Sequence, residues 1–281
     1  MCGVEELLRA LYHRVSTHYN TVPSLWYSAH TMNQVADICT QFAVGNPVSI
    51  TELSGGLVHT TYKVVTDGGT YILQRMNPIF NPSVVCLNVH AVTERLRAYG
   101  FETYTLVTTK TGACTHFDGQ FHWRVLTFLE GRIVSNGGDL DEVRSAGNLI
   151  GTFHDALRDF SGGVGHPLPG YHDTERYMEK LRRVDTTSYG TQKYELLHAS
   201  AQEILNAYEA LDHAVCHSSV RTFHGDPQIE NVMFRTGTKE AFTMIDLDTV
   251  WTYPIATEIG FVGWSWTKEL TSSGAIVAQD R

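Results

Sequence analysis

The amino-acid sequence predicts an α+β protein with two lobes, an antiparallel sheet followed by a mainly helical region. Two observations predict this fold class. Residues 47–129 contain short segments of alternating apolar and polar residues separated by turn signals, which is typical of strands. Residues 139–213 instead carry apolar residues at the three- and four-residue spacing of amphipathic helices. The pattern changes near Glu130, so we expect an N-terminal lobe over residues 1–130 and a C-terminal lobe over residues 131–281.

The N-terminal lobe begins with two amphipathic patterns, at residues 4–18 and 31–43, that predict helices. Helical spacing returns over residues 83–99. Between these helices, an Asp67-Gly68-Gly69 turn predicts a hairpin. The strands expected in this lobe are PVSITEL (47–53), TYKVVTD (61–67), GTYILQRM (69–76), TYTLVTT (103–109), ACTHFDG (113–119) and FHWRVLTFL (121–129).

The C-terminal lobe is expected to contain helices at residues 139–158, 173–184 and 192–213. Farther along, VMFRTGTKEAFTMIDLD at 232–248 reads as two alternating strands around a Thr-Gly-Thr turn. Such a hairpin would return Asp246 to the side of Asn231.

The composition excludes several classes of partner. The formal net charge is −9 and the sequence has no run of Lys or Arg, so nucleic acids and anionic membrane surfaces are not expected to bind. No apolar run is long enough to cross a bilayer, and we expect a cytoplasmic protein. The five cysteines are scattered and form no CxxC pair, which argues against a disulfide framework and a thiolate zinc site.

The stretch HGDPQIEN at 224–231 carries the chemistry. Asn231 and Asp246 would offer an amide oxygen and a carboxylate, which are hard ligands suited to Mg²⁺, while Asp226 could accept a proton from a substrate hydroxyl. An isolated Asp-x4-Asn pattern is more often a capped turn, but the hairpin that adds Asp246 favours the metal interpretation. A base beside a metal that neutralises phosphate charge is what phosphoryl transfer requires.

HGDPQIEN followed by MIDLD resembles the catalytic loop and metal-binding segment of the aminoglycoside phosphotransferase and choline kinase group. The stretches LSGGLVHTTYKV, YILQRMN, VTERLRAYG and GYHDTERY are similar to those of its N-acetylhexosamine 1-kinase branch. The resemblance implies a two-lobed protein-kinase-like fold, with the nucleotide-binding sheet in the N-terminal lobe. It also implies ATP and Mg²⁺ as cofactors, with Asp226 as the catalytic base and with Asn231 and Asp246 as the metal ligands.

The resemblance implies further nucleotide contacts in the N-terminal lobe. The turn that covers the phosphates would be formed by Ser54, Gly55 and Gly56, and the hinge that receives adenine would be LTFLEG at 126–131, including Leu129. The family places a basic residue on the third strand, facing a glutamate of the next helix. The candidates here are Gln74 and Arg75, with Glu94 either as the partner or as a solvated residue of the helix. Strand alternation puts Gln74 on the face of Ile72 and directs Arg75 the other way.

The predicted activity is an ATP-dependent transfer of phosphate to a hydroxyl of a small polar molecule, such as an N-acetylhexosamine. Two alternatives stay open: an amino-alcohol or aminoglycoside kinase, and a nucleotide-binding module without activity. The family continues with an acidic-Gly segment, matched here by Glu258-Ile259-Gly260, but the tail from Trp264 onward has no counterpart. The C-terminal lobe is therefore expected to be shortened. The sequence indicates no oligomeric state.

Three further residues near these motifs have a structural interpretation. We expect Asp248 to be a loop-stabilising acceptor rather than a second metal ligand, and His224 to bind the backbone of the catalytic loop. His59 is expected to be a surface loop histidine.

Overall fold

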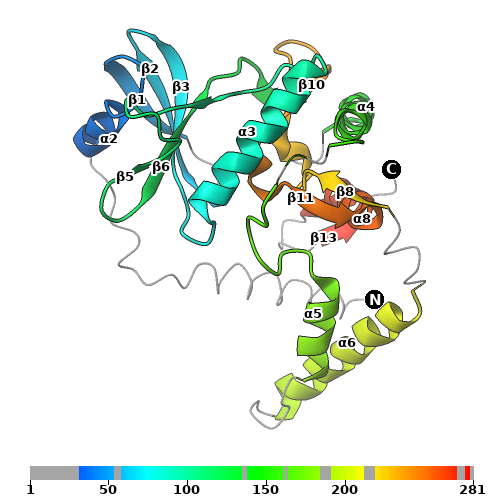
Figure 1. Cartoon of the computed structure of the whole chain (residues 1–281). Coiled ribbons are helices and arrows are strands. Elements are labelled where there is room, and N and C mark those ends of the chain that lie inside the picture. The colour runs from blue at the N-terminus through cyan, green and yellow to red at the C-terminus, as the bar shows by residue number, and fades with distance from the viewer. Residues whose placement is uncertain are drawn as a thin grey trace.

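The structure is a computed structural model and describes residues 32–53, 58–134, 138–160, 162, 164–183, 191–211, 219–270 and 276–278. The helix predicted at residues 4–18 lies outside these ranges, as do Ser54, Gly55 and Gly56 of the predicted phosphate turn. The described part forms an N-terminal sheet flanked by helices and a helix-rich C-terminal part (Figure 1).

The N-terminal sheet has six strands, all paired antiparallel. The hairpin predicted at Asp67-Gly68-Gly69 joins its second and third strands, and Gly69 supplies the positive φ of 140° that the turn requires. The strands, in spatial order, are β1 (Pro47–Leu53), β2 (Thr60–Thr66), β3 (Gly69–Arg75), β6 (His122–Thr127) and β4 (Leu106–Val107), with β5 (His116–Phe117) paired to β6.

Helices cover the two faces of this sheet (Figure 1). The outer face packs against α2 (Met32–Cys39), and its buried residues include Tyr62, Leu73 and Val125. The inner face packs against α3 (Pro82–Ala98) and the C-terminal lobe through a second core that contains Leu126 and the partly buried Ile72. Because side chains alternate along a strand, neighbouring residues of β3 and β6 belong to different cores.

In its described residues, the C-terminal lobe combines helices with a three-stranded sheet and two strand pairs. Asp139 is the N-cap of the helix α4 and forms a capping box with Glu142. Helices α5 and α6 project from the body as a pair (Figure 1). The helices are α4 (Leu140–Ala156), α5 (Thr174–Arg182), α6 (Thr191–Glu209) and α8 (Ile255–Thr267). The strands are β7 (Arg132–Ile133), β8 (Val220–Phe223), β9 (Val232–Phe234), β10 (Ala241–Met244), β11 (Trp251–Pro254), β12 (Lys268–Leu270) and β13 (Ile276–Ala278).

Two cysteines that the sequence gives no reason to pair lie together. Cys86 of α3 and Cys114 of the loop before β5 form a disulfide, with their Cα atoms 6.4 Å apart. The expectation of unpaired cysteines was therefore wrong for this pair, since the fold brings together residues 28 positions apart. Cys39 is a buried free thiol, and burial raises its pKa to about 11.

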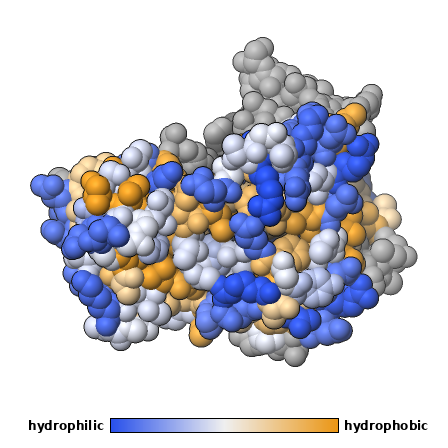
Figure 2. All heavy atoms as spheres, turned by 90° about the horizontal axis from the view of Figure 1, so that it is seen from above, coloured by the Kyte–Doolittle hydropathy of each residue, from blue (hydrophilic) through white to orange (hydrophobic). Residues whose placement is uncertain are grey.

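The surface carries no single apolar face in the view of Figure 2, where hydrophilic side chains separate the hydrophobic patches. Within the described residues, no helix is both long and apolar enough to cross a membrane.

Candidate active site

The loop after β8 places Asp226 beside Asn231. β8 ends at Phe223, and the chain passes through an extended loop into a short 3₁₀ helix, Ile229–Asn231. The side-chain nitrogen of Asn231 donates to the backbone oxygen of Asp226 at 2.9 Å and to its carboxylate at 3.3 Å. Gln228 donates to the other carboxylate oxygen at 2.8 Å. Asn231 uses its amide nitrogen in both contacts, and neither involves its amide oxygen, which could therefore bind a metal.

The predicted hairpin is present and returns Asp246 to this loop. Strand β10 pairs antiparallel with β9, and the backbone nitrogen of Ile245 donates to the carbonyl of Asn231 at 2.9 Å. Asp246 follows with a left-handed φ of 59°, a conformation that costs an L-residue roughly 1–2 kcal/mol. Hydrogen bonds on both sides fix it there, because Leu247 also donates its backbone N–H to the Tyr104 hydroxyl at 3.2 Å.

Side chains of helix α8 and of His224 bind the backbone of the loop that carries Asp226. The Glu258 carboxylate is 2% exposed and accepts the backbone N–H groups of His224 and Gly225 at 3.1 and 3.0 Å. The His224 ring accepts the N–H of Asp226 on Nδ1 and donates from Nε2 to the carbonyl of Ile245 at 2.9 Å. The expectation that His224 binds the loop backbone is confirmed, and its ring links the loop to the hairpin.

Gly225 cannot be replaced without moving this loop. Its φ is 82°, and a Cβ atom there would lie 2.5 Å from the carbonyl oxygen of Thr249. The residue before the candidate base is therefore a glycine because of both its backbone conformation and the space around it.

A buried network adjoins Asp246. The Asp248 carboxylate accepts a hydrogen bond from Arg124 at 2.7 Å and one from His59 Nε2 at 2.8 Å. His59 Nδ1 accepts the backbone N–H of Asn77, so the proton of the neutral ring lies on Nε2 and is donated to Asp248. Asp248 is the stabilising acceptor that the sequence predicts. The expectation for His59 was wrong: it is buried because Asp248 and Asn77 satisfy both of its ring nitrogens.

The pKa values of the two carboxyl groups in this network shift in opposite directions. Burial, together with the neighbouring Asp248, raises the pKa of Asp246 to about 6. Burial opposes ionisation of Asp248 as well, but Arg124 and His59 hold its pKa well below the usual range. His59, Asp246 and Asp248 offer ligand atoms that all lie within 4.8 Å of one another. Because His59 and Asp248 already bind each other, Asp246 is the carboxylate whose charge a cation would stabilise, and the site fits Mg²⁺.

The sheet residues expected to contact the nucleotide have separate positions. Gln74 lies on the inner face, as alternation predicts, and accepts a hydrogen bond from Arg124 Nε at 2.9 Å. Arg75 points the other way, donates to Thr60 and lies over the Phe121 ring, 4.7 Å from its centre. It therefore does not fill the place of an inward basic residue.

Of the two interpretations of Glu94, the structure shows the solvated helix residue. Its carboxylate is 58% exposed and forms an ion pair with Arg97 one turn away, because this position lies on the solvent side of α3. Leu129, in the segment that follows β6, is half-buried and packs against the inner core. The sequence does not indicate the role of Arg124, which depends on a contact between residues 124 positions apart.

The GYHD turn at residues 170–173 lies beside the loop that carries the candidate base, Asp226. The His172 ring binds the carbonyl oxygen of Gly225 at 2.5 Å, and its backbone has a left-handed φ of 57°. Burial raises the pKa of the adjacent Tyr171, and the carboxylate of Asp226 adds to the effect. The GYHD turn therefore lies against the loop of Asp226.

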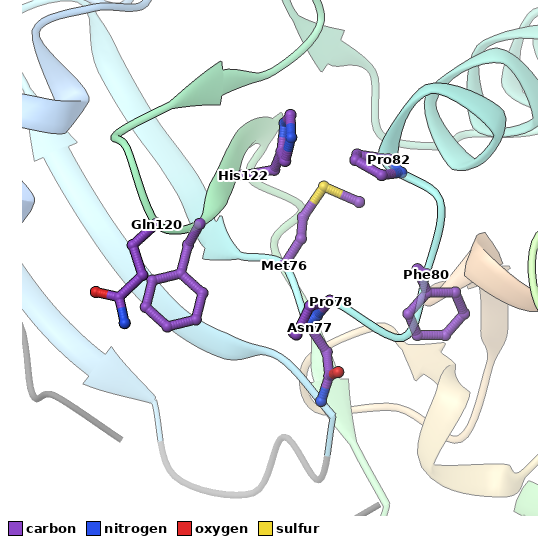
Figure 3. Close-up of a pocket in the computed structure, with 8 residues that line it drawn as sticks. Met76, Asn77, Pro78, Phe80, Pro82, Gln120 and His122 are labelled. Atoms are coloured by element: carbon purple, nitrogen blue, oxygen red, sulfur yellow. The ribbon is translucent and has the colours of Figure 1, made fainter. Parts of the chain in front are cut away.

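A pocket of about 130 Å³ lies elsewhere, where β3 leads into α3. Figure 3 shows Met76 reaching toward Pro82, with Phe80 and His122 near them. None of the predicted site residues lines this pocket, but two of its lining residues, Asn77 and Phe80, contact His59 of the buried network.

Comparison with known proteins identifies the family of the chain and its fold. The model of the phosphotransferase enzyme family matches residues 49–278. The fold is similar to that of the amicoumacin kinase hAmiN in complex with AMP-PNP, Ca²⁺ and Ami, with 17% identity over 84% of this chain and 69% of that chain and a TM-score of 0.60.

Two other solved structures share the fold. A microcompartment-associated aminopropanol kinase is 17% identical over 84% of this chain and 79% of that chain, with a TM-score of 0.58. An aminoglycoside phosphotransferase from Alicyclobacillus acidocaldarius is 18% identical over 84% of this chain and 71% of that chain, with a TM-score of 0.53.

Proposed function

Because the chain belongs to the phosphotransferase enzyme family, and is a kinase that moves phosphate from a nucleotide to a hydroxyl group, we propose how its residues divide this reaction. Asp226 is the catalytic base, and Asn231 and Asp246 are the metal ligands. The observation that supports this assignment is the meeting of these three residues where the loop after β8 adjoins the β9–β10 hairpin.

Each of the three residues has its own task. Mg·ATP supplies the phosphoryl group, and the metal offsets the phosphate charge. Asp226 accepts the proton of the acceptor hydroxyl and orients its oxygen for attack. The bonds from Gln228 and Asn231 hold both carboxylate oxygens of Asp226 in place, so the base is already positioned when the acceptor binds.

The nucleotide would lie between the lobes, with residues 1–130 as its lobe and residues 131–281 as the acceptor lobe. Leu129 supports the adenine assignment, because a half-buried apolar residue in the segment that follows β6 offers a surface for a flat ring. Ser54, Gly55 and Gly56 remain our assignment for the phosphate turn, on the basis of the sequence.

A sugar is the favoured acceptor, for example an N-acetylhexosamine. Tyr171 and His172 border the loop of Asp226, and burial lowers the pKa of His172, so the ring is neutral near pH 7. A neutral wall of aromatic rings suits an uncharged polyhydroxyl molecule, whose apolar ring face packs against such side chains.

The alternative acceptor is an amino alcohol or an aminoglycoside. The likeness of the fold to an aminopropanol kinase supports it. A cationic acceptor would need carboxylates near Asp226, but Glu258 and Asp248 are buried and already bind the loop backbone and Arg124.

Measuring ATP consumption by the full chain against N-acetylhexosamines, other sugars, amino alcohols and aminoglycosides tests this proposal. We expect Mg²⁺-dependent turnover with a sugar. Turnover with amino alcohols alone would make an amino alcohol, and not a sugar, the acceptor of this kinase. Mg·ATP binding without turnover on any of them would instead favour a nucleotide-binding module.

A further inference from the structure

We infer that Arg124 is a positioning residue for the metal site: it is the cation that ties the N-terminal sheet to the segment carrying Asp246. This inference rests on the proposed function, because it takes Asp246 to be a metal ligand. Arg124 would take the place of the basic residue that the sequence seemed to require on β3.

The sheet register decides which arginine can act at the site. Gln74 pairs with Arg124, and Ile72 with Leu126, so these four side chains share the inner face. Arg75 is one residue farther along β3 and pairs with Trp123, which is completely buried in the outer core. Of these two arginines, the one on the inner face is therefore Arg124 of β6.

Burial and two hydrogen bonds hold the guanidinium of Arg124 in one orientation. Its side chain is 2% exposed, and that of Asp248 is 1% exposed, so the pair is shielded from water. Nε donates to Gln74 while Nη1 donates to Asp248, and these two bonds from one planar guanidinium set the direction of the carboxylate. A lysine has no such fork and could not hold both partners in this geometry.

The fixed position of Asp248 also restrains Asp246, two residues earlier in the chain. One oxygen of Asp248 binds Arg124 and the other binds His59, whose second ring nitrogen is held by the backbone of Asn77. Both contacts come from the N-terminal lobe. The segment with the left-handed Asp246 is thus anchored to the sheet through its neighbour, and outer contacts of this kind orient the groups that bind a metal.

Two other cations of this lobe lie elsewhere. Lys63 shares the inner face but lies over the Phe128 ring, 4.2 Å from its centre, at the hinge end of the sheet. Arg97 is bound to the exposed Glu94 on α3. Arg124, by contrast, forms an ion pair with Asp248 of the metal-binding segment.

The test titrates Mg²⁺ into the full chain at a fixed concentration of AMP-PNP and follows nucleotide binding by calorimetry. In Arg124→Lys we expect the Mg²⁺ concentration for half-maximal binding to rise by roughly 10-fold or more. Loss of a residue that orients metal ligands from outside typically weakens metal binding by this amount. Binding of AMP-PNP in EDTA should change little. Arg97→Lys is the matched control and should leave the Mg²⁺ requirement unchanged.

Asp248→Asn is a second variant, in case Arg124→Lys does not fold. It keeps the shape of the side chain but loses the charge, and we expect the same rise in the Mg²⁺ requirement. A folded Arg124→Lys protein with a lower melting temperature and a wild-type Mg²⁺ requirement would make Arg124 merely structural and overturn the inference.

Two further outcomes would also overturn it. A rise in Arg75→Lys but not in Arg124→Lys would assign the role to the other arginine. Equal binding of AMP-PNP by the wild-type protein with and without Mg²⁺ would contradict the proposed metal site itself. This failure is distinguishable from failure of the Arg124 inference because it appears in the wild type, without any variant.

Discussion

The indole Nε1 of Trp266 donates a 2.8 Å hydrogen bond to the backbone carbonyl of Pro227, the residue after the proposed base. Glu258, two turns earlier on α8, accepts the N–H of Gly225, the residue before it. Helix α8 therefore holds the backbone on both sides of Asp226. The expectation that the tail from Trp264 onward has no counterpart in the family was wrong, because the family model matches as far as residue 278, and Trp266 of this tail holds the loop of Asp226.

Removing the indole donor should loosen this loop. Trp266→Phe keeps most of the buried volume but leaves the Pro227 carbonyl without its donor, which should lower the free energy of unfolding by about 1–3 kcal/mol. We also expect kcat to fall severalfold, because the base becomes less well oriented. Urea unfolding and steady-state kinetics measure both effects. Trp264→Phe, at a side chain 39% exposed, is the control, and equal effects in the two variants would contradict the role of Trp266.

Local patterns predicted most of the elements and the centre of the site. Alternation predicted β1, β2 and β3, and the Thr-Gly-Thr turn predicted the hairpin that returns Asp246 to Asn231. These features depend on residues close together in the chain, so a short stretch of sequence contains the information. The same alternation separated Gln74 from Arg75 correctly.

Contacts between distant segments could not be predicted in this way. The pairing of β8 with β11 joins two short segments without a turn between them, and no periodic pattern marks either one. Arg124 looks like an ordinary residue of an apolar strand until Asp248 is placed beside it. The sequence left two interpretations of Glu94 open for a related reason, since only the packing of α3 shows which side of the helix faces solvent.

The disulfide should stabilise the protein. Closing a 28-residue separation between Cys86 and Cys114 should add about 3 kcal/mol to the free energy of unfolding, chiefly by restricting the unfolded chain. Thermal melts with and without a phosphine reductant, together with mass spectrometry of the linked peptides, measure this. Cys86→Ser should melt like the reduced wild type and should not respond to the reductant. An unchanged melt of wild type after confirmed reduction would contradict the prediction.

Stability should fall in mild acid, in part because of His172. Burial lowers its pKa in the folded protein, against the opposing effects of the Gly225 carbonyl and Glu258. The unfolded state then binds the proton more readily, so the stabilisation is complete above the unfolded pKa of about 6.5 and is lost as the pH falls through the folded pKa. Urea midpoints at about pH 7.5 and about pH 5.5 measure the loss.

A substitution isolates the contribution of this histidine. His172→Gln keeps a donor for the Gly225 carbonyl but cannot take up a proton, so the difference between the two midpoints should shrink. Some dependence should remain, because burial also lowers the pKa of His122, His166 and His224. An undiminished difference in the variant would show that protonation of His172 does not contribute.

Asp246→Ala should weaken binding of Mg·ATP while the protein stays folded. The residue lies where the hairpin meets the catalytic loop and remains partly accessible, so its loss removes a metal ligand and opens no core cavity. Calorimetry with Mg·AMP-PNP and a thermal melt measure affinity and folding separately. Asp141→Ala, an exposed acid on α4, is the control. Wild-type affinity in Asp246→Ala would remove this residue from the metal site.

The last prediction separates chemistry from binding at Asp226. A base that orients the acceptor hydroxyl acts mainly in the transition state, so Asp226→Asn should lower kcat by roughly 10²-fold or more. The affinity for Mg·ATP should change little, because the proposed metal ligands are Asn231 and Asp246 rather than Asp226. The amide of the variant can still accept a hydrogen bond from Gln228, which should keep the loop in place. Steady-state kinetics with the best acceptor and calorimetry with Mg·AMP-PNP must then diverge. Full turnover in Asp226→Asn would show that another group takes the proton, and a parallel loss of nucleotide affinity would place Asp226 in the metal site instead.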